Sequence, residues 1–224
     1  MNDANQKLDK DGLANLAIDP DLLARELAAQ LAGDPLDEIE LDENDHGLAN
    51  SSKECDQALK WLQSGHNERL QGLRVFCEHR DPRAVPLLIP LLDEPSPVVR
   101  MSAVYALGRN PCPQAIDLLL HLLKYDSNAY VRKATAWSLG NYSDALVLEP
   151  LINALKHDVA AVRLWASSSL AEVGLNLSDH SLPAANQLLE SLQIDGEPIV
   201  RSNCIWSLGR LYCLLSEEIK IDIE

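Results

Sequence analysis

Four large aromatic residues recur at related positions beside arginines. Three of the rings follow an arginine by five residues and the fourth follows one by two: Tyr105, Trp137, Trp206 and Trp165. Aromatic residues are enriched among those that dominate protein-binding surfaces. On a helical wheel the shared position falls on the flank of a helix, so the rings either face a partner or pack against a neighbouring helix. We expect partner binding, and the packing interpretation stays open here.

The arginines themselves need a countercharge. Each stands in the first turn of an expected helix: Arg100, Arg132, Arg163 and Arg201. The helix macrodipole disfavours a cation at this place. Aspartates precede the arginines by five to seven residues, in the turn between two helices: Asp93, Asp126, Asp158 and Asp195. A ladder of Asp–Arg hydrogen bonds, within or between the repeats, would satisfy both the turns and the arginines.

The five cysteines lack the spacing of a metal site or of a disulfide framework. Cys77 with His79, and Cys204 with Cys213, are the pairs to consider as ligands for iron, a cluster or a bilin. Buried cysteine more often packs as a small hydrophobe, so we predict no metal site and no resident cofactor. The sequence holds no phosphate-binding glycine loop, HExxH or GxSxG motif, and we predict no catalytic residue.

These residues lie in a repeat of two helices. The four arginines are 32, 31 and 38 residues apart. Leucine-rich helices are expected before them, beginning at Pro86, Asp117, Pro150 and Asn186, and a fainter first copy has helices at Ala58–Leu62 and Arg69–Phe76. A period of this length with two helices per unit is typical of an α-solenoid, so the sequence predicts an all-α fold.

Glycine is expected to end the second helix in three units. It follows the repeat arginine by eight residues, the place of a C′ glycine, at these positions: Gly108, Gly140 and Gly209. The unit that begins with Arg163 has Ala171 in this place, and Gly174 comes three residues later. We therefore expect its second helix to be longer than the others.

Charge divides the 224 residues into three parts. The formal charge is −15, and residues 1–50 alone hold 13 acidic and 3 basic side chains. We predict an acidic, largely flexible arm over 1–50 with one helix at Asp19–Leu31, the solenoid over 51–216 and a charged tail over 217–224. The negative charge disfavours nucleic-acid binding. Without a long apolar run or a secretory leader, the protein is expected to be cytoplasmic with no membrane span.

The unit of aspartate, turn, Val-Arg and closing Ala-Leu-Gly resembles the HEAT repeat, in the short form seen in phycobilisome lyases. The match covers about residues 56 to 211. It implies a right-handed α-solenoid of about five HEAT-like helical hairpins. An acidic arm followed by five such units is also similar to small cyanobacterial HEAT-repeat proteins that partner an A-type iron–sulfur scaffold.

The resemblance implies binding more than catalysis. We expect a non-catalytic adaptor that binds another protein on the concave face of the solenoid, in the assembly or maintenance of a photosynthetic or iron–sulfur complex. The leading partners are an iron–sulfur scaffold and a phycobiliprotein. The alternative is a phycobilin lyase subunit or a phycobiliprotein chaperone that positions a bilin for attachment to an antenna-protein cysteine. The aromatic residues and the repeat arginines would then hold the tetrapyrrole, the arginines through its propionates.

Overall fold

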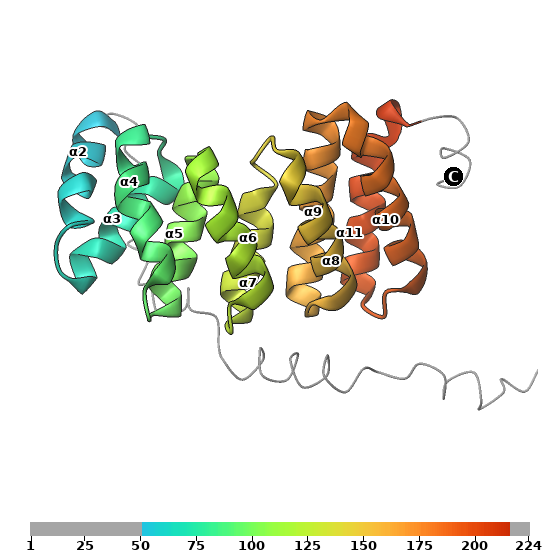
Figure 1. The fold of residues 1–224 in the computed structure, drawn as a ribbon, viewed down its shortest axis with the longest axis horizontal. Helices are drawn as coiled ribbons and strands as arrows, with labels where there is room; N and C mark the ends of the chain where they lie inside the picture. Colours follow the sequence, from blue (N-terminus) through green and yellow to red (C-terminus); the bar gives the residue numbers. More distant parts are fainter. Residues whose placement is uncertain (1–50, 216–224) are drawn as a thin grey trace, which may run out of the picture.

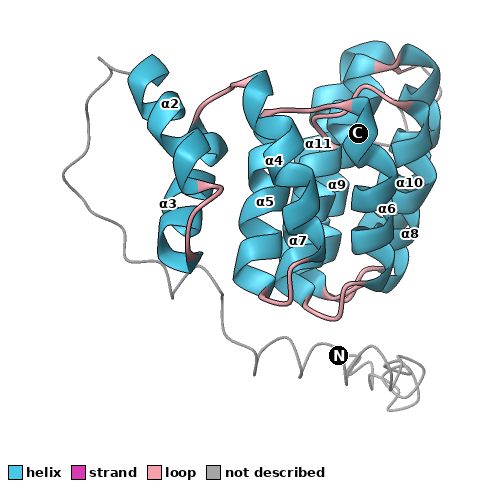
Figure 2. Cartoon of the chain, turned by 60° about the vertical axis from the view of Figure 1, so that its left-hand side comes forward, coloured by secondary structure: helices cyan, strands magenta, loops and turns pink. Residues whose placement is uncertain are grey.

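The structure, a computed structural model, describes residues 51–215; the predicted arm over 1–50, with its helix at Asp19–Leu31, and the predicted tail over 217–224 lie outside the described residues. Within the described range every regular element is a helix. The helices stand side by side in a row that begins at α2 (Ser51–Trp61) and ends at α11 (Pro198–Leu211) (Figure 1). Loops gather at the two ends of the helices (Figure 2). The predicted all-α solenoid is confirmed.

Five helical hairpins make up the row. The second helices of the hairpins are α3 (His66–Glu78), α5 (Pro97–Arg109), α7 (Ala129–Leu139), α9 (Ala160–Asn176) and α11. The first helices after α2 are α4 (Val85–Leu88), α6 (Ile116–Tyr125), α8 (Leu148–His157) and α10 (Ser181–Ile194). Short 3₁₀ segments accompany them: η2 (Pro82–Ala84), η3 (Ile89–Asp93), η4 (Pro113–Ala115), η5 (Ala145–Val147), η6 (Ser178–His180) and η7 (Tyr212–Leu214). With 17 residues, α9 is the longest second helix, as expected, although it continues past Gly174 to Asn176 and so does not end at that glycine.

The second helices form a continuous layer because their contact positions hold small residues. α5 packs on α7, α7 on α9 and α9 on α11. The residue three places after each repeat arginine is fully buried in this layer: Ala103, Thr135, Ala166 and Cys204. Small side chains at a helix contact let the two axes approach closely. The layer is therefore the tightly packed side of the solenoid.

Gly108 and Gly140 serve this close approach. The expectation that a C′ glycine ends the helix is wrong for Gly108 and Gly209, whereas α7 does end directly before Gly140. A Cβ on Gly108 would lie 2.6 Å from the Trp137 ring, and a Cβ on Gly140 would lie 2.6 Å from the Ser169 hydroxyl. Gly108 lies inside α5, Gly209 lies inside α11, and Gly140 follows α7 with a right-handed φ of −62°. None of the three adopts the left-handed conformation of a C′ glycine.

The first helices are less closely packed and leave grooves between them. Grooves of about 680, 490 and 290 Å³ lie between η3 and α6, between α6 and α8, and between α8 and α10. The largest of these three borders an irregular first helix. Pro90 has no N–H to donate to the carbonyl of Pro86, so the helix expected from Pro86 is divided into α4 and η3.

Candidate functional site: the second-helix face

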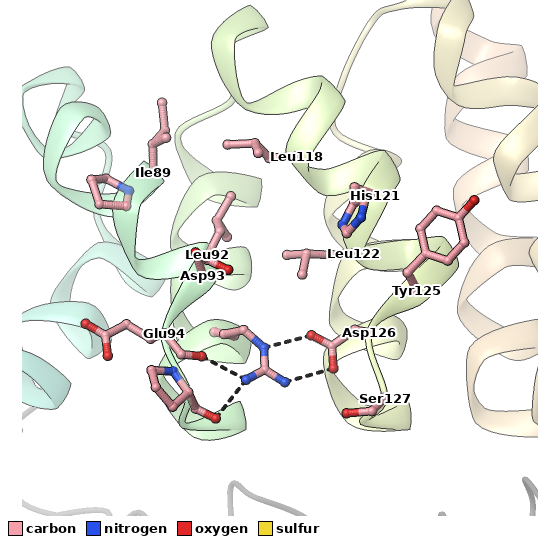
Figure 3. A pocket seen from close by; sticks show the side chains of 13 residues that line it. Ile89, Leu92, Asp93, Glu94, Leu118, His121, Leu122, Tyr125, Asp126 and Ser127 are labelled. Carbon is pink, nitrogen blue, oxygen red and sulfur yellow. Dashed lines mark hydrogen bonds and ion pairs between the residues drawn. The ribbon is translucent and has the colours of Figure 1, made fainter.

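Three of the repeat arginines bind the aspartate of the following unit. Each guanidinium makes two parallel hydrogen bonds to one carboxylate, through Nε and Nη2, at 2.7 to 2.9 Å. The pairs are Arg100 with Asp126, Arg132 with Asp158, and Arg163 with Asp195. Figure 3 shows the two bonds at Asp126. Such a bidentate geometry fixes orientation as well as distance, so each pair sets how one unit docks on the next.

The remaining nitrogen of the same guanidinium binds the unit that carries it. Nη1 donates to the backbone carbonyl of Glu94 from Arg100, of Asp126 from Arg132 and of Asp158 from Arg163, each at 2.8 Å. One side chain thus ties together the turn of its own hairpin and the turn of the next. The ladder is an arrangement between units, and its arginines stay in the first helical turn because their charge is neutralised by the neighbour.

The ladder begins one unit earlier than expected and with a different acid. Arg69 on α3 pairs with Glu94 at 2.8 Å. Asp93, assigned to the ladder from its spacing, is exposed, and no hydrogen bond or ion pair joins it to an arginine within residues 51–215. This corrects the predicted set: Glu94 precedes Arg100 by six residues, as Asp126 precedes Arg132 and Asp195 precedes Arg201, and it takes the place assigned to Asp93. Arg69 precedes Arg100 by 31 residues, and that period is the signal that could have revealed it.

The ladder ends at Arg201. Its Nη1 donates to the carbonyls of Asp195 at 2.8 Å and Gly196 at 3.0 Å. Within residues 51–215 no carboxylate receives its other nitrogens. The inner pairs, by contrast, are deeply enclosed, with 7% and 6% of the Arg132 and Asp158 side chains exposed. In the inner pairs the guanidinium is thus committed to a carboxylate and a backbone carbonyl of the protein itself.

Two of the predicted aromatic residues lie together across a unit boundary. The rings of Tyr105 on α5 and Trp137 on α7 have centroids 5.3 Å apart and are tilted by 55°. The Trp137 ring covers Gly108, and the Arg109 guanidinium lies 6.0 Å from its centroid. Arg109 also donates from Nε to the carbonyl of Cys77 on α3. Both rings are half-buried, so they take part in packing as well as facing outward.

The other two predicted rings are more exposed. Trp165 on α9 is 36% exposed and Trp206 on α11 is 54% exposed. The Arg210 guanidinium lies 5.0 Å from the centroid of Trp206, and Arg210 is ion-paired with Glu172 on α9. These rings, with Tyr105 and Trp137, lie on the second helices, and we call the exposed side of α3, α5, α7, α9 and α11 the second-helix face.

A further set of contacts joins the units at the opposite end of the second helices, and the sequence analysis missed it. Asn110 donates to the carbonyl of Phe76 at 3.3 Å and accepts from the N–H of Asp81 at 2.7 Å. One unit later, the Tyr142 hydroxyl donates to the carbonyl of Leu107 at 3.2 Å, and burial raises the pKa of this phenol. Asn110 and Tyr142 both follow a repeat arginine by ten residues, which is the signal that could have found them.

The cysteines do not gather into a site. Within the described residues, no group of three or more His, Cys, Asp or Glu side chains could hold a metal ion. Burial raises the pKa of Cys77 and of Cys204 to about 12 in each case, so both remain neutral thiols near pH 7. Cys77 donates from Sγ to the carbonyl of Ser102, whereas Cys213 is exposed.

The family of the chain follows from its repeats. Among the helices in residues 51–215, none combines the length and the hydropathy needed to cross a membrane. A comparison of the chain with curated proteins gives no match. The family model for HEAT repeats matches residues 56–140 and again residues 116–209, which together include the ladder from Arg69 to Arg201. The protein is therefore a member of the HEAT-repeat family.

Proposed function

We propose that this protein is a non-catalytic scaffold that binds its partner protein on the second-helix face. HEAT repeats suggest a protein-interaction role. The observation that carries the proposal is the exposure of two tryptophans on this face, 36% for Trp165 and 54% for Trp206. Large apolar rings left accessible on a folded domain are typical of binding anchors.

The shape of the solenoid supports the same face. The second helices approach closely through Gly108 and Gly140, whereas the first helices are separated by grooves. A stack whose two layers differ in spacing curves toward the closer layer, which makes the second-helix face the concave one. A concave face offers a partner contacts from several units at once.

Two arginines beside the rings give the face a polar component. Arg109 lies over Trp137 and Arg210 lies over Trp206. Arg210 is already held by Glu172, and Arg109 donates from Nε to the carbonyl of Cys77, so the remaining N–H groups of each guanidinium are the ones left to bind carboxylates and carbonyls of a partner. By resemblance, the partner we propose is an iron–sulfur scaffold or a phycobiliprotein, met during assembly or maintenance of its complex in the cytoplasm.

The alternative function is that of a phycobilin lyase subunit or phycobiliprotein chaperone. The aromatic row favours it, because flat rings could stack on a tetrapyrrole. The engagement of Arg100, Arg132 and Arg163 with aspartates weighs against it, since those side chains were the expected ligands of the propionates. A bilin would have to use Arg109 or Arg210 instead.

The proposal is tested with matched baits in native lysate. The variant Trp165→Ala/Trp206→Ala removes the exposed rings, and Leu146→Ala/Leu182→Ala removes two exposed leucines from the first-helix side as a control. Proteins bound to each bait are quantified by mass spectrometry. We expect the tryptophan variant to lose its partner by about tenfold or more, since binding anchors have effects of this size, and the control to retain it. Equal recovery by both baits would refute the assignment of this face.

The choice between the two functions uses the same purified proteins. A visible absorption band that accompanies the wild-type protein and disappears in the tryptophan variant would favour the lyase or chaperone. Recovery of iron–sulfur assembly proteins without such a band would favour the scaffold.

A further inference from the structure

Three positions on α11 form one stripe that a sixth unit would cover. Arg201, Ile205 and Gly209 are spaced four residues apart and so lie along one side of the helix. We call these three residues the end stripe. At Arg201 the carboxylate that every inner arginine receives from the next unit is missing within residues 51–215.

Ile205 and Gly209 also lack the neighbouring atoms that surround their equivalents in the inner units. Ile205 is 57% exposed, whereas residues at the equivalent position of inner units, Val104 and Ala136, are fully buried. Gly209 has no atom of the described residues within 4 Å of an added Cβ, whereas Gly108 and Gly140 have contacts at 2.6 Å. Arg201, Ile205 and Gly209 each lack, among the described residues, the contact that the equivalent inner residue makes with the next unit. The end stripe therefore has the character of a unit boundary whose second side is not formed by residues 51–215.

We propose that residues 217–224 of the same chain bind along the end stripe. These residues, Glu-Glu-Ile-Lys-Ile-Asp-Ile-Glu, carry four acidic side chains and one basic one, which complements the charge of Arg201. Their three isoleucines, Ile219, Ile221 and Ile223, alternate with charged residues, so an extended segment presents them all on one side.

The spacing of the two partners matches. Positions four apart on a helix are separated by about 6 Å, and alternate residues of an extended segment by about 6.6 Å. If the segment returns toward the beginning of α11, Ile219 lies at the level of Gly209 and Ile221 over Ile205. Ile223 then reaches the level of Arg201. Asp222 and Glu224 alternate with the isoleucines and so lie on the outer side of the segment, where they supply negative charge near the Arg201 guanidinium and not the direct contact that the inner aspartates make.

The segment is also long enough and begins close by. The structure is described to Leu215, and the nine residues from 216 to 224 can span about 30 Å when extended. The stripe from Gly209 to Arg201 measures about 12 Å along the helix. A short tether gives the segment a local concentration in the millimolar range, so even weak contacts would keep it bound.

A second copy of the chain fits this surface less well. Stacking head to tail would place the turn of the first hairpin, residues 62–65, against Arg201. That turn reads Leu-Gln-Ser-Gly and contains no carboxylate. Since each inner arginine takes an acid from the turn of the next unit, a second copy cannot continue the ladder. Solenoids need such an end cover to stay soluble.

The test is a photo-crosslink from the end stripe in the full-length protein. Ile205 is replaced by p-benzoylphenylalanine, and the linked residues are mapped by mass spectrometry. Leu146, equally exposed but at η5, carries the probe in the control. A mixture of isotopically heavy and light chains separates links within one chain from links between chains. We expect links from position 205 to residues 219–224 of the same chain, and none to these residues from position 146.

Variants outside the helical hairpins then check the specificity of the contact without disturbing the fold. Ile219→Asp/Ile221→Asp should lower the intramolecular yield by about tenfold or more, and Lys220→Arg should leave it unchanged. Asp222→Asn/Glu224→Gln should lower it less and remove its sensitivity to salt. Links only between chains, links to other residues, or yields that ignore the isoleucine changes would each overturn the proposal.

Discussion

The inner unit boundaries and the C-terminal end of the array are built from nearly the same helix in different surroundings. α5 reads Val-Arg-Met-Ser-Ala-Val-Tyr-Ala-Leu-Gly, and α11 reads Val-Arg-Ser-Asn-Cys-Ile-Trp-Ser-Leu-Gly. In α5 the arginine is paired and Val104 is buried, whereas in α11 the arginine lacks a carboxylate partner among the described residues and Ile205 is exposed. The repeat motif therefore provides only one side of a unit boundary, and the contacts that its residues make depend on the unit that follows.

The largest loss of stability should come from removing the carboxylate of one inner Asp–Arg pair. Asp158→Ala leaves the buried Arg132 guanidinium without its countercharge, and we expect the free energy of unfolding to fall by about 3–5 kcal/mol. Asp93→Ala, in the equivalent turn but unpaired with an arginine, should change it by less than about 0.5 kcal/mol. Urea denaturation measures both. Similar losses in the two variants would mean that the aspartate acts through its turn and not through the ladder.

A smaller but opposite pair of effects is expected at the glycines. Gly140→Ala places a Cβ against Ser169, including 3.0 Å from its backbone Cα, so we expect a loss of about 1–3 kcal/mol in stability. Gly209→Ala meets no described atom and improves helix propensity, for a gain of about 0.5–1 kcal/mol. Thermal unfolding of the two variants gives the comparison directly, and a loss at position 209 as large as that at 140 would contradict it.

The hydroxyl of Tyr142 should matter less again. Tyr142→Phe keeps the ring and removes only the hydrogen bond to the carbonyl of Leu107, so about 1 kcal/mol of stability should be lost. Tyr125→Phe is the matched control because its ring is 62% exposed. An unchanged urea midpoint in the first variant would show that the units are not joined at this end by the hydroxyl.

The two cysteines of the last hairpin, Cys204 and Cys213, should differ in their reactivity toward alkylating reagents. Cys204 is buried against the preceding unit, and burial raises its pKa to about 12, whereas Cys213 is exposed. Alkylation at pH 8 should therefore label Cys213 and spare Cys204. The pKa of a cysteine in the unfolded chain is about 8.5, so the thiol of Cys204 holds its proton more tightly in the folded state. The resulting contribution to the free energy of unfolding is complete below about pH 8.5 and is lost as the pH rises toward about 12. Rapid labelling of Cys204 in the folded protein would contradict its burial.

The sequence was sufficient for the fold because its signals are periodic. Arginines 31 to 38 residues apart and alternating leucine-rich segments predicted the all-α solenoid. The greater length of α9 was also expected, but for a reason that does not hold, because the helix runs through Gly174 and does not end there. Periodicity could not say whether an arginine bonds within its unit or to the next, because both distances in sequence recur equally. The assignment of Asp93 failed for a different reason: Glu94, six residues before Arg100 as Asp126 is before Arg132, takes that place and pairs with Arg69.

The candidate site was less predictable because exposure depends on the neighbouring unit. Trp137 and Trp206 occupy the same position of the repeat, yet one ring is half-buried over Gly108 and the other is largely exposed. Pro90 illustrates the same limit at the level of one helix. Its missing N–H was readable from the sequence, but the width of the groove that results was not.

The grooves of the first-helix layer also determine how the array bends. The second helices are in close contact at Gly108 and Gly140, so the layer that they form has little room to be compressed further. The first-helix layer contains grooves between its helices. If the curvature of the solenoid changes, we therefore expect the volume of these grooves to change and the contacts between the second helices to stay the same. Of the three grooves, the one beside the divided α4–η3 segment has the largest volume, so the boundary between the second and third hairpins leaves the most room for such a change.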